Sequence, residues 1–188
     1  EARQRSRVLA GQSIGRTIND FYARYRAAVQ TGNVFSASNV AAQAVSVALT
    51  TTYTGLCVSN PVGSKKNLVM LACQYALTVA PAAIASLHLI AGGSGAGVVT
   101  HTTPLAAPGI QSCLIGTGNG ITGMSSVAKA DSAATVVNPY YLAGLGSGFT
   151  AAALYATTPL LIDLAGIVIV EPGGWIAWGA LTAVTGFG

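Results

Sequence analysis

The sequence predicts an all-β protein built as a sandwich or barrel, with a basic arm at its N-terminal end. Short apolar runs rich in Val, Ile, Thr, Leu and Tyr suit the pleated, half-buried surface of a strand, and clusters of Gly and Pro separate these runs. No long amphipathic helical pattern occurs in the body, and 188 residues are enough for one such domain. We expect an arm over residues 1–31 and one β-sandwich domain over residues 32–188.

Strong turn signals divide the body into segments of strand length. They lie at Asn60–Gly63, Ala80–Pro81, Gly92–Gly97, Ala107–Gly109, Gly116–Gly120, Gly144–Gly148 and Glu171–Gly174. The residue types between them predict strands at Val45–Thr52, Thr54–Ser59, Asn67–Val79, Ala85–Ala91, Ile110–Ile115, Ala134–Val137, Ala151–Tyr155, Ile167–Val170 and Trp175–Val184. A Ser-, Asn- and Ala-rich stretch, residues 31–48, is expected to wrap over the domain before the first firm strand.

The last two predicted strands carry the most specific packing expectations. Ile167–Val170 is apolar at successive positions, which predicts that both of its faces are covered, either inside the sandwich or at a subunit contact. Strand alternation places Trp175 and Trp178 on opposite faces. In one interpretation one ring lies in the core and the other against a partner, and in the second both rings pack in a thick core. Trp175 and Trp178 are therefore candidate subunit-contact residues.

The chain carries little charge for a soluble domain. Only 7% of its residues are charged, 52% are hydrophobic, and the mean hydropathy is +0.58, whereas an ordinary domain is about 25% charged. A bilayer, a fibrous material or a large assembly would each tolerate such a body. Pro81 interrupts the apolar stretch 68–91 and Asp163 interrupts the stretch 151–170, so neither fits a membrane-spanning helix. We expect no membrane, and an assembly whose neighbouring copies cover the apolar surface.

The net charge of +4 belongs to the N-terminal arm, where six of the nine basic residues lie and all six are arginines: Arg3, Arg5, Arg7, Arg16, Arg24 and Arg26. Apolar and aromatic residues between Ile18 and Val29 follow helical spacing and predict a short helix. The arm has several interpretations. A nucleic-acid tether would neutralise phosphates, but the aromatic residues sit at helical spacing rather than on a sheet, so we expect no nucleic acid. A membrane-surface helix would need an apolar face that residues 1–16 lack.

The all-arginine composition favours a third interpretation, an arm that binds carboxylates of a neighbouring protein, because bidentate pairing favours Arg over Lys. A disordered solubilising tail stays as the alternative. The six arginines are accordingly our candidate partner-binding residues.

The residues that usually carry chemistry are few. His88 and His101 have no second ligand at metal-binding spacing, and His88 is expected to pack in an apolar strand while His101 lies in a polar loop. Cys57, Cys73 and Cys113 match no zinc or disulfide pattern and are interpreted as buried small hydrophobes of a protein assembled in a reducing cytoplasm. The glycine-rich stretches match no phosphate-binding motif. We therefore predict no catalytic residue, no metal and no cofactor.

Three segments carry a resemblance to a known class of protein. They are Gly32–Asn39, then Thr51–Pro61 with its Asn60-Pro61 ending and its continuation Lys65–Leu71, and finally Ile167–Ala177 with its Pro172-Gly173-Gly174-Trp175 turn. Over roughly residues 32–183 the chain resembles small structural proteins of tailed bacteriophage virions.

The resemblance implies a sandwich of the jelly-roll type and a non-enzymatic virion component. We expect a capsid decoration or cement protein that binds the major capsid protein or other virion proteins, forms a homo-oligomer with a trimer favoured, and is located in the virion after assembly in the host cytoplasm. Two alternatives stay open. A tail- or fibre-associated receptor-binding module would bind glycan or host surface through exposed loops such as Thr135–Gly148. An outer-membrane β-barrel would need regular alternating strands and a signal peptide. An enzyme is the weakest interpretation.

Overall fold

The described part of the chain is all-β apart from short helical segments, as the sequence predicts. Two compact units are present: residues 1–36 with 112–119, and residues 37–111 with 120–188. The structure, a computed structural model, describes residues 25–39, 43–75, 85–93, 100–101, 110–114, 129–149, 160–180 and 184–187.

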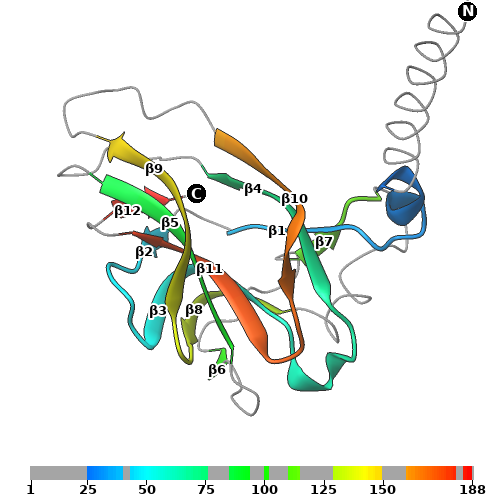
Figure 1. Cartoon of the computed structure of the whole chain (residues 1–188), viewed down its shortest axis with the longest axis horizontal. Coiled ribbons are helices and arrows are strands. Elements are labelled where there is room, and N and C mark those ends of the chain that lie inside the picture. Colours follow the sequence, from blue (N-terminus) through cyan, green and yellow to red (C-terminus); the bar gives the residue numbers. More distant parts are fainter. Residues whose placement is uncertain are drawn as a thin grey trace, which may run out of the picture. The chain divides into compact units, whose positions relative to one another are not determined.

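Twelve strands and one short 3-10 helix, η1 (Val62–Ser64), are described (Figure 1). The strands are β1 (Phe35–Ala37), β2 (Gln43–Val45), β3 (Thr52–Ser59), β4 (Leu68–Tyr75), β5 (Ala85–Gly93), β6 (Thr100–His101), β7 (Ile110–Ser112), β8 (Lys129–Thr135), β9 (Tyr140–Phe149), β10 (Leu160–Val170), β11 (Gly174–Ala180) and β12 (Val184–Phe187).

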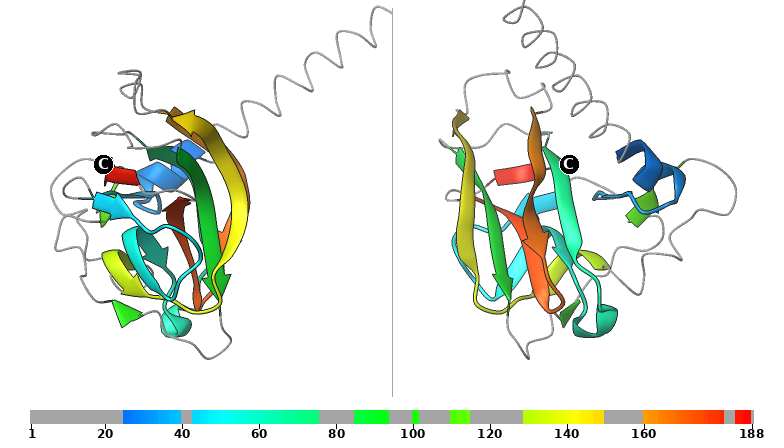
Figure 2. Two further views of the ribbon diagram at one scale, coloured as in Figure 1. Left: turned by 90° about the vertical axis from the view of Figure 1, so that its left-hand side faces the viewer. Right: turned by 45° about the vertical axis from the view of Figure 1, so that its right-hand side comes forward.

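Six strands form the main sheet in the order β6-β8-β3-β11-β5-β9, with every pairing antiparallel. Strands β4 and β10 form a separate antiparallel pair, and Figure 2 shows this pair facing the main sheet as a second layer. Two further pairs are β1 with β7 and β2 with β12. This is a β-sandwich, as predicted, and the jelly-roll topology stays a prediction.

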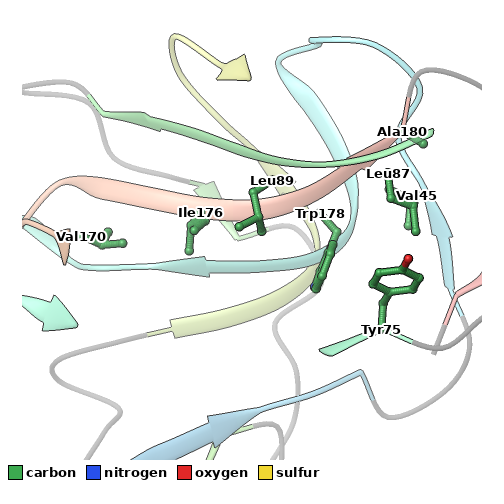
Figure 3. Close-up of a cluster of buried hydrophobic side chains, with 8 residues drawn as sticks. All are labelled: Val45, Tyr75, Leu87, Leu89, Val170, Ile176, Trp178 and Ala180. Carbon is green, nitrogen blue, oxygen red and sulfur yellow. The ribbon is translucent and has the colours of Figure 1, made fainter. Parts of the chain in front are cut away.

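A cluster of buried apolar side chains, here called the sandwich core, fills the space between the two layers (Figure 3). Its buried members are Val45, Tyr75, Leu87, Leu89, Val170, Ile176, Trp178 and Ala180. Half-buried side chains from β4 and β10, including Met70 and Val168, pack against it. The Tyr75 and Trp178 rings meet edge to face with centroids 5.5 Å apart, the geometry that aromatic pairs prefer.

A second cluster lies on the opposite face of the main sheet, and its members are Tyr53, Cys57, Ile90, Ala134, Val136, Trp175 and Ala177. Side chains alternate between the two faces along β11, so Ile176 and Trp178 lie in the sandwich core while Trp175 and Ala177 lie in the second cluster. The Trp175 indole nitrogen donates a hydrogen bond to the Val137 carbonyl oxygen at 3.0 Å. Gly92 permits this close packing, because a Cβ there would lie 2.6 Å from the same carbonyl oxygen.

The sequence located most strands, but several segments differ from the prediction. His101, predicted in a polar loop, belongs to β6, and β10 begins at Leu160, before the predicted strand Ile167–Val170. Val45–Thr52, predicted as one strand, contains the end of β2 and the start of β3 with non-strand residues between them. Gly144–Gly148 was predicted as a turn and belongs to β9, so Thr135–Gly148 is not one exposed loop. Pairing with β5 stabilises β9 as a strand despite its glycines, and the register shifts three times along that pairing. The predicted strand at Ala151–Tyr155 lies outside the described residues.

The predicted arm helix is described only at its end, where residues 25–30 are helical. Gly32 takes a left-handed conformation, with φ of 69°. Its N–H donates to the Val29 carbonyl oxygen, and the Asn33 N–H donates to that of Ala28. These two bonds form a Schellman motif, which ends the helix and satisfies carbonyls that have no partner inside it.

Asn60, at the end of β3, is almost completely buried and uses every polar atom. Its side-chain amide donates to the carbonyl oxygens of Lys66 and Val170 at 2.7 and 2.8 Å, and its side-chain oxygen accepts from the Ser64 hydroxyl at 2.6 Å. Its backbone donates to the Gly174 carbonyl oxygen and accepts from the Gly173 N–H. Two of the three segments that carry the resemblance are therefore in direct contact through this residue.

Replacing Asn60→Ala should lower the free energy of unfolding by about 2–3 kcal/mol, because it leaves the buried Val170 carbonyl without its partner. Denaturant unfolding with an unchanged m-value measures the loss. The matched control is Asn67→Ala, since Asn67 is exposed and such a change costs less than about 0.5 kcal/mol. Equal losses in the two variants would contradict the assigned role of Asn60.

Candidate assembly surface

One face of the β4–β10 pair is exposed and mostly apolar, with Gln74 and Asp163 also exposed on it. Along β10, exposed and half-buried residues alternate, as they do in a strand with only one covered face. The inward residues pack against the sandwich core. The outward ones include Leu161, Ile167 and Ile169, exposed by 65%, 85% and 54%, and Val69 of β4, exposed by 51%. We call these four residues the outer face.

Val69 and Ile169 of the outer face lie directly opposite each other across the pair. The sequence predicted that both faces of Ile167–Val170 are covered, and coverage inside the sandwich is wrong for Ile167 and Ile169. No described residues cover the outward face of the second layer, so its side chains that alternate away from the core are exposed. A subunit contact, the other predicted cover, stays open for these side chains.

A bulge in β10 makes Ile167 the most exposed residue of the outer face. The register shifts between Asp163 and Val168, where β10 has more residues than the facing part of β4. Ala165 and Gly166 take left-handed conformations with φ of 48° and 72°, and the Asp163 carboxylate accepts a hydrogen bond from the Ala165 N–H at 2.8 Å. Bulges are designed features that re-aim side chains, and this one leaves Ile167 the most exposed large apolar side chain described.

Asp163 is the single charged residue in the sequences of β4 and β10. Surfaces of this kind on monomers are usually interrupted by several charges, and contiguous exposed apolar patches mark interaction sites or aggregation hazards. Free strand edges carry the same hazard, and among the described strands β4 and β10 pair only with each other. The outer face therefore has the composition of a surface that a partner covers.

Trp175 and Trp178 do lie on opposite faces of β11, as predicted, but both are buried within this chain. Trp175 belongs to the second cluster and Trp178 to the sandwich core. Of the two interpretations, packing of both rings inside the fold is the one that the structure supports. The main sheet has apolar residues on both faces, which is why neither ring is left for a subunit contact.

Of the six candidate arginines, Arg26 lies within the described residues, on the exposed side of the helical turn 25–30. Arg3, Arg5, Arg7, Arg16 and Arg24 lie outside the described residues. The expectation that they bind a partner therefore stays a prediction.

His88 is half-buried and makes polar contacts that the sequence did not reveal. Its Nε2 shares a hydrogen bond of 2.8 Å with the Ser86 hydroxyl. The centroid of its ring lies 5.1 Å from the ring centroid of Tyr141 on β9. In enzymes with a nucleophilic serine, a histidine base lies within the same hydrogen-bond distance of the hydroxyl. No carboxylate among the described contacts orients the imidazole, so the geometry shown here is that of a packed polar pair rather than a triad.

The three cysteines form no disulfide and differ in burial. Cys57 is buried, as predicted, whereas Cys73 is half-buried and Cys113 is exposed, so the prediction that all three are buried is wrong. Burial raises the pKa of the Cys73 thiol. Cys113 directly follows the short strand β7. Its residue type gives no sign of whether other elements cover this segment, so the sequence could not predict its exposure.

Tyr53 in the second cluster is buried, and its hydroxyl has no hydrogen-bond partner in the described structure. Desolvation, with a smaller contribution from the nearby Cys57 thiol, raises the pKa of Tyr53 well above 10. The tyrosine is therefore a buried neutral group in the folded protein.

Comparison with protein-family models, with curated protein sequences and with solved structures finds no match to this chain. Within the described part of the chain, no three His, Cys, Asp or Glu side chains are grouped closely enough to hold a metal ion. The helical segments described there are all too short or too polar to cross a bilayer.

The Tyr53 hydroxyl predicts a specific dependence of stability on pH. The phenol ionises near pH 10 in the unfolded chain and at higher pH in the folded chain. Its contribution to the free energy of unfolding is therefore fully present below pH 10 and is lost as the pH rises further. The slope reaches about 1.4 kcal/mol per pH unit for one proton. Tyr53→Phe should reduce this alkaline loss and be at least as stable as the natural chain at pH 7, because an unpaired hydroxyl leaves the core.

Denaturant unfolding between pH 7 and 11 measures the effect. Tyr140→Phe is the control at pH 7, since Tyr140 is exposed and the change should alter stability by less than about 0.5 kcal/mol. A Tyr53→Phe protein that loses stability at pH 7 would show that the hydroxyl has a partner.

Proposed function

We propose that this chain is a non-enzymatic structural subunit, a capsid decoration or cement protein of a tailed bacteriophage virion. The observation that carries the proposal is the outer face, an apolar surface that an isolated subunit would leave in water. The resemblance of residues 32–183 supplies the virion context. The subunit would form a closed homo-oligomer, with a trimer favoured, and would bind the major capsid protein or another virion protein.

The proposed mechanism is mechanical. The sandwich would sit at junctions between capsid subunits, and the arm would cross onto a neighbour and pair its arginines with carboxylates there. Such contacts would oppose expansion of the shell by packaged DNA. Arg26 supports this reading, because it is exposed at the end of the arm, where a second protein can reach it.

A receptor-binding module of a tail or fibre is the second candidate. The observation that favours it is the exposure of two aromatic residues of β9, Tyr140 and Tyr141, the second of which has its ring centroid 5.1 Å from that of the half-buried His88. Aromatic rings with adjacent polar groups suit the amphipathic faces of a sugar. Binding of the soluble protein to a glycan array, lost in a Tyr140→Ala/Tyr141→Ala variant, would favour this candidate over a capsid protein.

Light scattering in detergent-free buffer is expected to show a discrete soluble oligomer. Ile167→Asp/Ile169→Asp should lower the native mass, because two carboxylates would be desolvated at the contact. The fold should survive, since both positions are exposed. Val62→Asp is the control, an exposed apolar residue outside the outer face that should leave the mass unchanged. A natural chain that is monomeric at every concentration would overturn the assembly proposal.

Removal of residues 1–26 should weaken attachment to virion shells without changing the thermal unfolding of the sandwich. A full-length variant with all six arginines replaced by lysine separates the effect of charge from the effect of bidentate pairing, because it keeps the charge but loses the bidentate geometry. Cosedimentation with shells measures both. Undiminished attachment of the shortened chain would contradict the role of the arm.

A further inference from the structure

Strand β9 forms one edge of the main sheet. In the part of the chain that the structure describes it pairs with β5 on one side only, and Figure 2 shows it along the outer margin of the sheet in both views. An edge strand presents backbone N–H and C=O groups that another strand can pair with. At ten residues, β9 is also longer than most strands of the sheet.

The sequence of β9 lacks the charges and the proline that protect many sheet edges, although its pairing with β5 contains three register shifts. Natural edges carry lysine or other charges, or proline, which prevent a second strand from adding to them. None of these residue types occurs in Tyr140–Phe149. The edge is therefore uncharged, and two copies of it can approach each other without repulsion between like charges.

The ten residues also divide into a bulky half and a small half. Tyr140, Tyr141 and Leu142 begin the strand, whereas Gly144, Gly146, Ser147 and Gly148 dominate the rest. An antiparallel pair of identical strands places the beginning of each against the end of the other. In the pairing centred on Gly144, Tyr140 lies across from Gly148 of the second copy, and Leu142 lies across from Gly146 of the second copy. Aromatic side chains lying across glycines stabilise sheet edges.

We propose that β9 binds β9 of a second copy in a two-fold antiparallel pairing centred on Gly144, which joins the two main sheets into one. A second copy of β9 supplies both a small half that faces the tyrosines and an uncharged edge. A two-fold contact uses the same segment twice, and this is the commonest symmetry of homo-oligomers. The contact is separate from the outer face and does not depend on it.

This inference extends the proposed function. A subunit with one self-contact closes into a small oligomer, whereas a subunit with two different contacts can build a larger closed oligomer of dihedral symmetry or an extended layer. The outer face and β9 belong to different sheets of the sandwich, so they can be occupied at once. If the assembly proposal fails, the β9 contact still predicts a dimer.

A cysteine at the two-fold axis tests the pairing. Directly opposite residues of an antiparallel pair have Cα atoms about 4.5–5.5 Å apart, which lies within the range of a disulfide. Gly144 accepts a side chain, because it is exposed and a Cβ there would lie 3.7 Å from the nearest His88 ring atoms. The variant is the full chain with Gly144→Cys and with Cys113→Ser, which removes the exposed natural thiol.

Mild oxidation should convert most of this variant into a disulfide dimer linked through position 144, identified by peptide mass spectrometry. The matched control is Gly63→Cys in the same Cys113→Ser background, because a Cβ at this exposed residue would meet nothing within 4 Å. The control should form dimers at least about tenfold more slowly, since only an opposed pair is held at bonding distance. Equal rates in the two variants would overturn the proposal.

A second variant keeps the test independent of cysteine chemistry. Ala143 is exposed on β9, and Ala143→Lys adds the charge that natural edges use, so the dimer should weaken by about tenfold or more. Thr135→Lys is the control, because β8 already has strands on both sides there. Light scattering of both in the Ile167→Asp/Ile169→Asp background isolates the β9 contact. A mass unaffected by Ala143→Lys would overturn the pairing and would mean that the three bulges of β9 protect its edge.

Discussion

The buried amide of Asn60 joins parts of the fold that are far apart in the sequence. Its side chain holds the end of β10 through the Val170 carbonyl and the loop before β4 through the Lys66 carbonyl, while its backbone holds the turn that starts β11. Hydrogen bonds of this one residue therefore link the two layers of the sandwich. Because a buried amide is costly unless each polar atom is paired, any displacement of β10 from the main sheet breaks several hydrogen bonds together.

The position of β10 determines the surface of the protein. Once Val170 is held inward, strand alternation sends Ile169 outward, and the bulge between Asp163 and Val168 then lifts Ile167 clear of the layer. The bonds that stabilise the sandwich thus create the outer face. A chain with only 7% charged residues has little else with which to keep this face apart from other copies, which is the physical basis for proposing an assembly subunit.

The two contacts that we propose differ in kind. The outer face would be covered through burial of apolar area, which is nearly independent of direction. The β9 edge would be covered through backbone hydrogen bonds, which fix orientation and register. A subunit that uses both would have one contact that supplies much of the affinity and another that fixes the geometry.

The sequence by itself determined the all-β class, the end of the arm helix region and the opposite faces of Trp175 and Trp178, because residue type, period-two alternation and turn residues act locally. Only the tertiary structure decided what covers each face. Both tryptophans are buried because apolar side chains pack on both faces of β11, and Ile167 is exposed because no described residues cover the outward face of β10. Gly144–Gly148 reads locally as a turn and became a strand because β5 supplies hydrogen-bond partners across the sheet. The strands that pair with a segment and the side chains that cover it come from distant parts of the sequence, so a local sequence pattern cannot predict them.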